Sequence, residues 1–197
     1  GDAAFHGTQI YAWIILKVCG IRLKVRGREN IEPGQRYVIL SNHASYLDPP
    51  ALVLALGLQY RWVIKKELRR VPLFGLALEA SRNLFIDRSK GSDALESIKR
   101  GVGQLPDGTG ILIFPEGTRS WDGKLLPFKK GGFVIAQDGE LPILPVTICG
   151  SHQRLPKGSA AFSSGDIEIV IHPPMASGAL PLDDLMTDVR NSIASSL

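Results

Sequence analysis

Residues 41–50 read Ser-Asn-His-Ala-Ser-Tyr-Leu-Asp-Pro-Pro, between a β-rich run at 36–40 and an apolar, helical pattern at 51–58. A strand-to-helix connection of this kind can present a side chain to a cleft from a rigid scaffold. Within it Asp48 stands before Pro49, as an N-cap residue stands before a proline of the first helical turn. We therefore expect His43 in a loop between a strand and a helix that Asp48 caps.

His43 and Asp48 lie five residues apart across this turn, so they can come within hydrogen-bond reach. A carboxylate that accepts a hydrogen bond from one imidazole nitrogen fixes the tautomer and raises the basicity of the other nitrogen. Such a base typically contributes on the order of 10²–10⁴-fold to a rate. The spacing alone fits a plain loop histidine beside a helix cap equally well, and the rest of the chain decides between the two.

A second stretch, residues 114–120, reads Phe-Pro-Glu-Gly-Thr-Arg-Ser and follows a strand-like run at 110–113. Gly117 permits close approach of the backbone, and Thr118 offers a hydroxyl. Arg119 offers a planar fork that suits phosphate. The stretch favours a site for an anionic oxygen, and its alternative is a strand-ending turn with a surface salt bridge.

The two stretches belong to four ordered blocks that resemble the 1-acylglycerol-3-phosphate acyltransferase family, within the wider glycerolipid acyltransferases. Residues 42–48 match its Asn-His-x-Ser-x-x-Asp motif, and residues 114–120 match Phe-Pro-Glu-Gly-Thr-Arg-Ser at every position. Residues 85–88 match a Phe-Ile-x-Arg block, and residues 144–146 match a strand with an internal proline. The resemblance extends from about residue 27 to residue 148.

This resemblance implies an acyltransferase that moves a fatty acyl group from a thioester to the free hydroxyl of 1-acylglycerol 3-phosphate, giving phosphatidate. His43 would be the general base, aligned by Asp48. Acyl-CoA or acyl-carrier protein would be the co-substrate, with no further cofactor and no metal. Arg119, with Arg88 as a weaker candidate, would hold the acceptor's phosphate, and Glu116 would orient Arg119 or the acceptor's glycerol. The implied substrate-binding residues are Arg88, Glu116, Gly117, Thr118, Arg119 and Lys65.

Other functions fit parts of the same pattern. The acceptor could be another lyso-lipid or glycerol 3-phosphate, and a non-catalytic lipid-binding protein could have the same fold. Ser45 could be the nucleophile of a hydrolase, but the chain has no Gly-x-Ser-x-Gly elbow, so we expect Ser45 to hydrogen-bond within its turn. His43, Asp48 and Glu116 could bind a metal, although an adjacent arginine would oppose a cation.

Charge is unevenly distributed along the 197 residues, whose net charge is +4. Residues 1–130 carry 20 Lys and Arg against 12 Asp and Glu, whereas residues 131–197 carry 3 against 7. The basic part contains both motifs, which suits anionic substrates and an anionic membrane surface. A basic chain could also bind nucleic acid, but the sequence has no zinc-ligand spacing and no recognised binding module, so we expect no nucleic-acid partner.

The N-terminal segment, residues 1–20, is expected to form an apolar helix with aromatic residues, packed on the core or lying at a membrane interface. Its apolar run is shorter than the about 20 residues that span a bilayer. We expect the acyltransferase domain to comprise residues 21–197. Relatives with hydrophobic N-terminal helices imply the cytoplasmic face of a membrane, with peripheral attachment or an N-terminal anchor. Two distant cysteines, Cys19 and Cys149, indicate no disulfide framework.

Strand-like runs alternate with helical patterns along the chain, which predicts a single-domain α/β fold with a central sheet flanked by helices, as in glycerolipid acyltransferases. Further strands are expected at 60–64, 83–87 and 143–149, and further helices at 92–105, from 128–132 to about 138, and at 182–193. Residues 21–26 and 166–171 alternate in polarity, which predicts half-exposed strands and a mixed sheet. His6, His152 and His172 lack a partner pattern and are expected in loops or at the surface.

Overall fold

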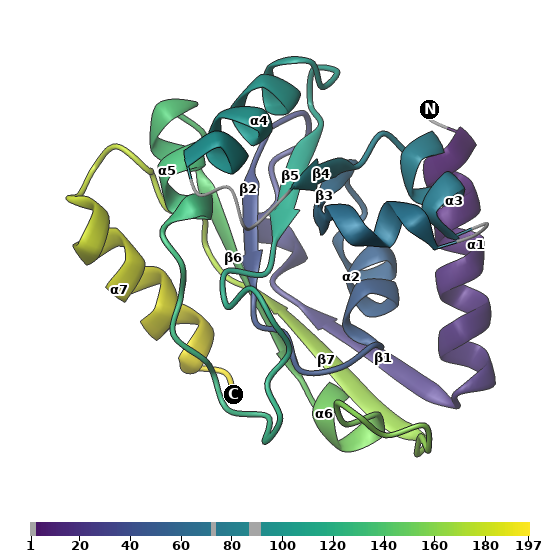
Figure 1. Ribbon diagram of the computed structural model, residues 1–197. Coiled ribbons are helices and arrows are strands. Elements are labelled where there is room, and N and C mark those ends of the chain that lie inside the picture. Colours follow the sequence, from purple (N-terminus) through teal and green to yellow (C-terminus); the bar gives the residue numbers. More distant parts are fainter. Residues whose placement is uncertain (1–2, 72–73, 87–91) are drawn as a thin grey trace.

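A seven-stranded sheet organises the residues that the computed structural model describes, which are 3–71, 74–86 and 92–197 (Figure 1). Its strand order is β1-β7-β6-β2-β5-β3-β4. The strands are β1 (Ile21–Arg26), β2 (Val38–Ser41), β3 (Tyr60–Lys65), β4 (Leu84–Ile86), β5 (Gly110–Ile113), β6 (Ile143–Cys149) and β7 (Gly165–Ile171). Every strand predicted from the sequence is present, although residue 87 of the predicted run 83–87 lies outside the described residues.

Helices of very different length connect these strands. The α-helices are α1 (Ala3–Val18), α2 (Asp48–Leu56), α3 (Phe74–Ala80), α4 (Ser92–Gly103), α5 (Gly131–Asp138), α6 (Ser151–Arg154) and α7 (Leu182–Ala194). Two 3₁₀ helices, η1 (Arg28–Asn30) and η2 (Lys66–Arg70), complete the described elements. The short α6 and both 3₁₀ helices were not predicted, because three to five residues are too few to show a helical period.

The sheet is mixed, as the alternating segments predicted. β6, β2, β5, β3 and β4 run parallel to one another, whereas β7 pairs antiparallel with β6 and β1 pairs parallel with β7. Alternate residues of the edge strand β1 are exposed, and its basic side chains pair with acids of β7. The first residues of β1 and β7 therefore lie at the edge of the sheet where the other five strands end.

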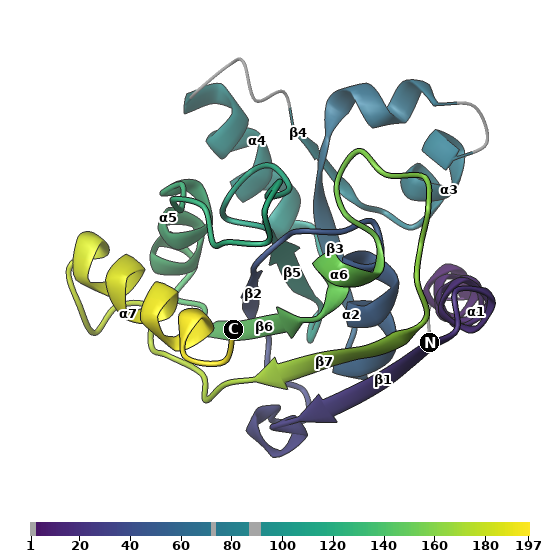
Figure 2. The same cartoon turned by 90° about the horizontal axis from the view of Figure 1, so that it is seen from below.

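Helices cover both faces of the sheet and divide the core into two layers (Figure 2). α1 and α2 pack on one face, with Leu52 and Ile39 among the fully buried side chains. α4, α5 and α7 pack on the other, around Phe133 and Val189. Because it is covered on both sides, the central strand β2 is buried at every position, which explains its unbroken apolar run.

α1 has one buried face and one exposed apolar face. Ala12 and Leu16 are buried in the core layer shared with α2. Exposed large apolar side chains on the same helix are Ile10, Tyr11, Trp13, Ile14 and Val18. Among the described residues, no helix combines the length and the apolar character needed to cross a bilayer. Core packing, the first of the two expectations for this segment, is thus confirmed for one face of the helix, and the position at a membrane interface stays a prediction.

Candidate active site

Two loops leave neighbouring parallel strands at the same edge of the sheet. β2 and β5 end side by side, since Leu40 pairs with Ile113. Asn42 then fixes the first loop to β6, because its side-chain amide donates to the Ile148 carbonyl at 2.9 Å and accepts from the Ile148 N–H at 2.8 Å. The carboxyl ends of parallel strands are where α/β sheets usually bind ligands. The two sequence motifs therefore meet at the expected edge.

His43 and Asp48 form the hydrogen bond that their spacing predicted, with 2.7 Å between His43 Nδ1 and Asp48 Oδ2. The same carboxylate oxygen accepts the backbone N–H groups of Ala44 and Ser45, each at 2.8 Å. Asp48 is fully buried. The prediction that Asp48 caps α2 was wrong, because the helix begins at Asp48 after Leu47 and no side chain caps it. The Asp48 carboxylate instead accepts hydrogen bonds from the loop that precedes the helix.

The ring of His43 is oriented on a second side by an aromatic stack. It lies nearly parallel to Phe114, with 3.8 Å between ring centroids and 8° between the planes. The carboxylate at Nδ1 favours a proton on that nitrogen, which leaves the lone pair on Nε2. The imidazole side chain keeps 17% exposure, so it is not sealed in the core. The geometry is compatible with the predicted role of a general base, which stays a prediction.

Glu116 joins the two loops through their backbones. Its Oε1 accepts the N–H of His43 at 2.6 Å, and its Oε2 accepts the N–H of Leu126 at 2.8 Å. A third link runs from the Ser120 N–H to the His43 carbonyl at 2.9 Å. Burial raises the pKa of Glu116 to about 7, against the lowering effect of the two N–H donors. Glu116 thus contacts the backbone of His43, and its predicted role in orienting Arg119 or the acceptor's glycerol stays a prediction.

Arg119 lies over the first loop rather than beside Glu116. Its guanidinium carbon is 3.5 Å from the centre of the Tyr46 ring, which makes a cation–π contact between the two motifs. Within the described part of the chain, Arg119 Nη1 is buried and has no hydrogen-bond partner. A buried guanidinium N–H without a partner is costly and is satisfied by an anionic oxygen. Arg119 thus has the geometry expected of an anion ligand.

Gly117 and Thr118 shape the loop before Arg119. Gly117 has φ +73°, and its N–H donates to the Phe114 carbonyl at 3.0 Å. A Cβ at this position would lie 2.9 Å from Lys129 Nζ, so the glycine allows the lysine to lie against the loop. Thr118 is exposed, and its Oγ1 accepts from Lys157 Nζ at 3.3 Å.

Lys157 is a residue that the sequence interpretation missed. Its Nζ donates to the Arg119 carbonyl at 2.8 Å and lies 4.4 Å from the centre of the Trp121 ring. The segment before it contacts the other motif, since Ser45 Oγ donates to the Leu155 carbonyl at 2.8 Å. Its place in the sequence was an indication of this position, because Lys157 comes after the carboxyl end of β6, a strand next to β2.

Of the two remaining predicted substrate-binding residues, Lys65 and Arg88, only Lys65 belongs to the described part of the chain. Lys65 ends β3 at the same edge, is exposed, and pairs with Glu67 at 3.5 Å. Arg88 lies outside the described residues. Lys65 is therefore placed at the correct edge of the sheet, and the roles of Lys65 and Arg88 stay predictions.

Residues of the two alternative chemistries, a serine nucleophile and a metal site, make other contacts in the structure. Ser45 is buried, and its Oγ accepts the Leu47 N–H at 3.1 Å besides donating to Leu155, as expected for a turn residue rather than a nucleophile. The Glu116 oxygens face backbone donors, so this carboxylate is oriented for hydrogen bonding rather than for sharing a cation with His43 and Asp48.

The other histidines only partly follow expectation. His6 is exposed on α1, and His152 is half-buried on α6. His172 lies in the loop after β7, as the first of the two expectations had it, but it is only 9% exposed, and its Nε2 is 2.8 Å from Thr147 Oγ1. Burial lowers the pKa of His172. Its partner lies on a neighbouring strand, which no local pattern reveals.

The fold and the site together define an α/β protein in which an oriented histidine lies beside an arginine-bearing loop, at the carboxyl edge of a mainly parallel sheet. Residues 22–149 match the sequence family described as Acyltransferase, and the chain belongs to this family. It is 34% identical to the chloroplastic 1-acyl-sn-glycerol-3-phosphate acyltransferase BAT2 of Brassica napus, over 98% of this chain and 56% of that protein.

Further relatives agree with this assignment. The 1-acyl-sn-glycerol-3-phosphate acyltransferase alpha of Homo sapiens is 35% identical, over 88% of this chain and 63% of the human protein. The crystal structure of the 1-acyl-sn-glycerophosphate (LPA) acyltransferase PlsC from Thermotoga maritima superimposes with a TM-score of 0.83 and 27% identity, over 98% of this chain and 77% of that one. The chain thus spans about 56 to 63% of these two sequence relatives and most of the solved structure.

Proposed function

We propose that this protein transfers a fatty acyl group from an acyl thioester to the free hydroxyl of 1-acylglycerol 3-phosphate, giving phosphatidate and a free thiol. The observation that carries the proposal is the 2.7 Å contact between His43 Nδ1 and Asp48 Oδ2, in a loop linked directly to that of Arg119. The names of the relatives, which are 1-acyl-sn-glycerol-3-phosphate acyltransferases, support the choice of reaction.

In the proposed reaction His43 Nε2 takes the proton of the acceptor hydroxyl as its oxygen attacks the thioester carbonyl carbon. The tetrahedral intermediate collapses with cleavage of the carbon–sulfur bond, and the imidazolium returns the proton to the leaving sulfur. Asp48 stabilises the charged imidazolium and keeps its ring in place. No metal or redox cofactor is needed, because the acceptor oxygen simply replaces the thioester sulfur on the acyl carbon.

Arg119 would bind the phosphate of the acceptor and so place its hydroxyl near His43. The partnerless Nη1 supplies a donor, and stacking on Tyr46 limits the motion of the guanidinium. Gly117 and Thr118 would complete the phosphate loop. Holding a reactant in position can lower a barrier by several kcal/mol. Lys65 and Arg88 remain candidates for further contacts with the anionic substrates.

Thiol release from acyl-CoA and from acyl-carrier protein, each with a panel of acceptors, tests this proposal. The panel comprises lysophosphatidate, glycerol 3-phosphate and lysophosphatidylcholine. We expect the fastest turnover with lysophosphatidate and loss of turnover in His43→Ala. A faster reaction with another acceptor would replace the proposed substrate. Binding of lysophosphatidate without thiol release from either donor would favour a lipid-binding protein that lacks catalysis.

We further propose that the protein acts at the cytoplasmic face of a membrane, attached peripherally or anchored through its N-terminal segment. The exposed apolar face of α1, with Tyr11 and Trp13, has the aromatic composition of an interfacial helix. Co-sedimentation with phospholipid vesicles tests this role. We expect Trp13→Ser to reduce binding and Leu180→Ser, an exposed apolar residue before α7, to leave it unchanged. Equal binding by both variants would overturn the proposal.

A further inference from the structure

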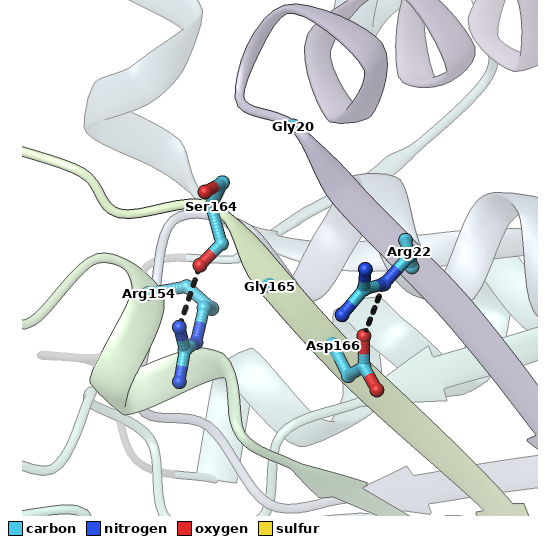
Figure 3. A pocket seen from close by; sticks show the side chains of 6 residues that line it. All are labelled: Gly20, Arg22, Arg154, Ser164, Gly165 and Asp166. Carbon is cyan, nitrogen blue, oxygen red and sulfur yellow. Dashed lines mark hydrogen bonds and ion pairs between the residues drawn. The ribbon is translucent and has the colours of Figure 1, made fainter.

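The cavities bounded by the described residues include two that lie outside the paired motif loops. The larger, about 950 Å³, opens at the opposite edge of the sheet, between loops that precede β2, β3 and β5. The other, about 520 Å³, lies at the starts of β1 and β7 beside the end of α6 (Figure 3). We refer to it as the β1–β7 cavity, and its lining residues are Gly20, Arg22, Arg154, Ser164, Gly165 and Asp166.

The β1–β7 cavity lies at the same edge of the sheet as His43. β7 is antiparallel to β6, so its first residues lie beside the end of β6, where Cys149 pairs with Glu168. β1 starts at the same edge because Ile21 pairs with Gly165. From β2 to β1 there are three strand spacings, which is about 14 Å across the sheet. One elongated ligand could therefore reach both the cavity and the base.

Two guanidinium groups flank Gly165 in this cavity (Figure 3). Arg154 Nη1 donates to the Ser164 carbonyl at 2.6 Å, whereas Arg154 Nε is buried and without a hydrogen-bond partner in the described chain. Gly165 makes this position possible, since a Cβ there would lie 2.5 Å from Arg154 Nη1. The second guanidinium, that of Arg22, is well exposed.

The cavity also contains one acid, Asp166, and the positive charge around it exceeds its single negative charge. Asp166 Oδ1 accepts from Arg22 Nε at 2.6 Å, and Oδ2 pairs with Lys24 Nζ at 2.6 Å. These two cations lower the pKa of Asp166 to about 2, so it stays ionised. Arg154 adds a third positive charge to the cavity and its surroundings, against the single carboxylate of Asp166. The excess charge and the remaining guanidinium N–H groups suit an anion with several oxygens.

We propose that the β1–β7 cavity binds a phosphate group through Arg22 and Arg154. Two sources share this chemistry. The acyl donor is the first, since coenzyme A carries its phosphates at the far end of a long pantetheine arm, and this source rests on the proposed function. The second is a phospholipid headgroup, because α1, which carries exposed apolar side chains, ends two residues before the lining residue Gly20.

Binding of coenzyme A and of vesicles to single variants tests this site. Arg22→Ala and Arg154→Ala are compared with Arg26→Ala, a matched control. Arg26 lies on the same face of β1 and makes the same type of ion pair, from Nε to Glu168 at 2.7 Å, but it does not line the cavity. We expect the cavity variants to weaken binding of one ligand about tenfold and Arg26→Ala to change it less than twofold.

The ligand that responds identifies the source of the phosphate. Weaker binding of coenzyme A, measured by calorimetry, assigns the cavity to the donor. Weaker binding of phosphatidylglycerol vesicles, with unchanged binding of coenzyme A, assigns it to a headgroup. If neither ligand responds, or if Arg26→Ala responds equally, the site is refuted. Arg154 holds the Ser164 carbonyl, so Arg154→Ala removes a structural contact as well as a charge. Arg22 does not hold this loop, so Arg22→Ala tests the site without that structural change.

These measurements also separate the cavity from the proposed acyl transfer. Binding is measured without turnover, so it remains informative if the wild-type protein releases no thiol. In an active enzyme, the cavity variants should raise the KM for the acyl donor and leave the KM for lysophosphatidate unchanged. His43→Ala should abolish turnover and keep the wild-type affinity for coenzyme A.

Discussion

The two motif loops differ in how tightly the protein encloses them. In the loop after β2, Asn42, Ser45 and Asp48 are all buried and hydrogen-bonded. Tyr46 is the exception in this loop, with 61% exposure. The loop after β5 is mixed, since Glu116 and Ser120 are buried whereas Thr118 and Trp121 are exposed. We refer to the loop after β2, which holds the proposed base, as the enclosed loop, and to the loop after β5, which holds the proposed anion site, as the open loop.

This difference matches what each loop would have to do. Proton transfer depends on distances of a few tenths of an ångström, so a base benefits from buried neighbours that hold its ring in place. An acceptor has to enter and leave, so its phosphate ligand needs an open approach. Glu116 fixes the position of the open loop relative to the enclosed loop, because its side chain accepts the His43 N–H. Mutations should therefore separate turnover from acceptor affinity.

The largest effect is expected in the enclosed loop. His43→Ala removes the proposed base, so kcat should fall on the order of 10²–10⁴-fold while the melting temperature changes little. Thiol release and thermal unfolding measure the two quantities. His6→Ala, an exposed histidine on α1, is the control and should retain wild-type kcat. A wild-type kcat in His43→Ala would contradict the role of this loop.

The pH dependence of the free energy of unfolding tests the role of Glu116, the residue that links the two loops. Its pKa is raised from the ordinary value of 4.5 to about 7, so between these values the folded state holds a proton that the unfolded state has lost. The free energy of unfolding should therefore fall as pH rises from 4.5 to 7, by up to about 3 kcal/mol, and stay level above 7.

Glu116→Gln removes this titration, so the slope between pH 4.5 and 7 should be shallower in the variant than in the wild type. Denaturant unfolding at a series of pH values measures it. Glu29→Gln, which alters an exposed glutamate of η1, should leave the wild-type slope unchanged. Parallel curves for wild type and Glu116→Gln would show that burial of Glu116 does not control its proton.

The sequence predicted the enclosed loop better than the links around it. His43 and Asp48 are five residues apart, so one turn sets their contact and a local motif reveals it. The partner of Glu116 is a backbone N–H 73 residues away, and a backbone group leaves no trace in the sequence. For this reason the motif indicated that Glu116 mattered but not what it contacts.

The fold shows the same limit. Alternating polarity identified β1 and β7 as half-exposed strands, because one-sided burial has a period of two residues. It could not show that Arg22 and Arg154 line one cavity, since this depends on β7 returning antiparallel beside β6. The burial of His172 was missed in the same way, as its partner Thr147 belongs to another strand.

In the open loop, Arg119→Ala should mainly reduce affinity for the acceptor. Loss of a guanidinium–phosphate contact should raise the acceptor KM about tenfold to a hundredfold, with kcat changing less. Arg119→Lys should restore only part of it, because an ammonium cannot form the planar fork. Arg100→Ala, an exposed arginine on α4, serves as control. If Arg119→Ala lowered kcat without moving the acceptor KM, the loop would not be the phosphate site.

The smallest effect should come from Lys157, which supports the open loop from a third segment. Its ammonium holds the Arg119 carbonyl and the Thr118 hydroxyl, so Lys157→Met should loosen the anion site without touching the base. We expect the acceptor KM to rise about threefold to tenfold, with kcat and the donor KM unchanged.

Two further variants separate positioning by Lys157 from a general structural role. Lys157→Arg keeps a donor for the Arg119 carbonyl and should recover most of the acceptor affinity, which a purely packing role does not predict. Lys124→Met changes a lysine with 86% side-chain exposure whose acid partner is 4.0 Å away, and it should behave as wild type. If Lys157→Met lowered kcat as strongly as it raised KM, the open loop would also control the position of His43, and the two loops would not be functionally separate.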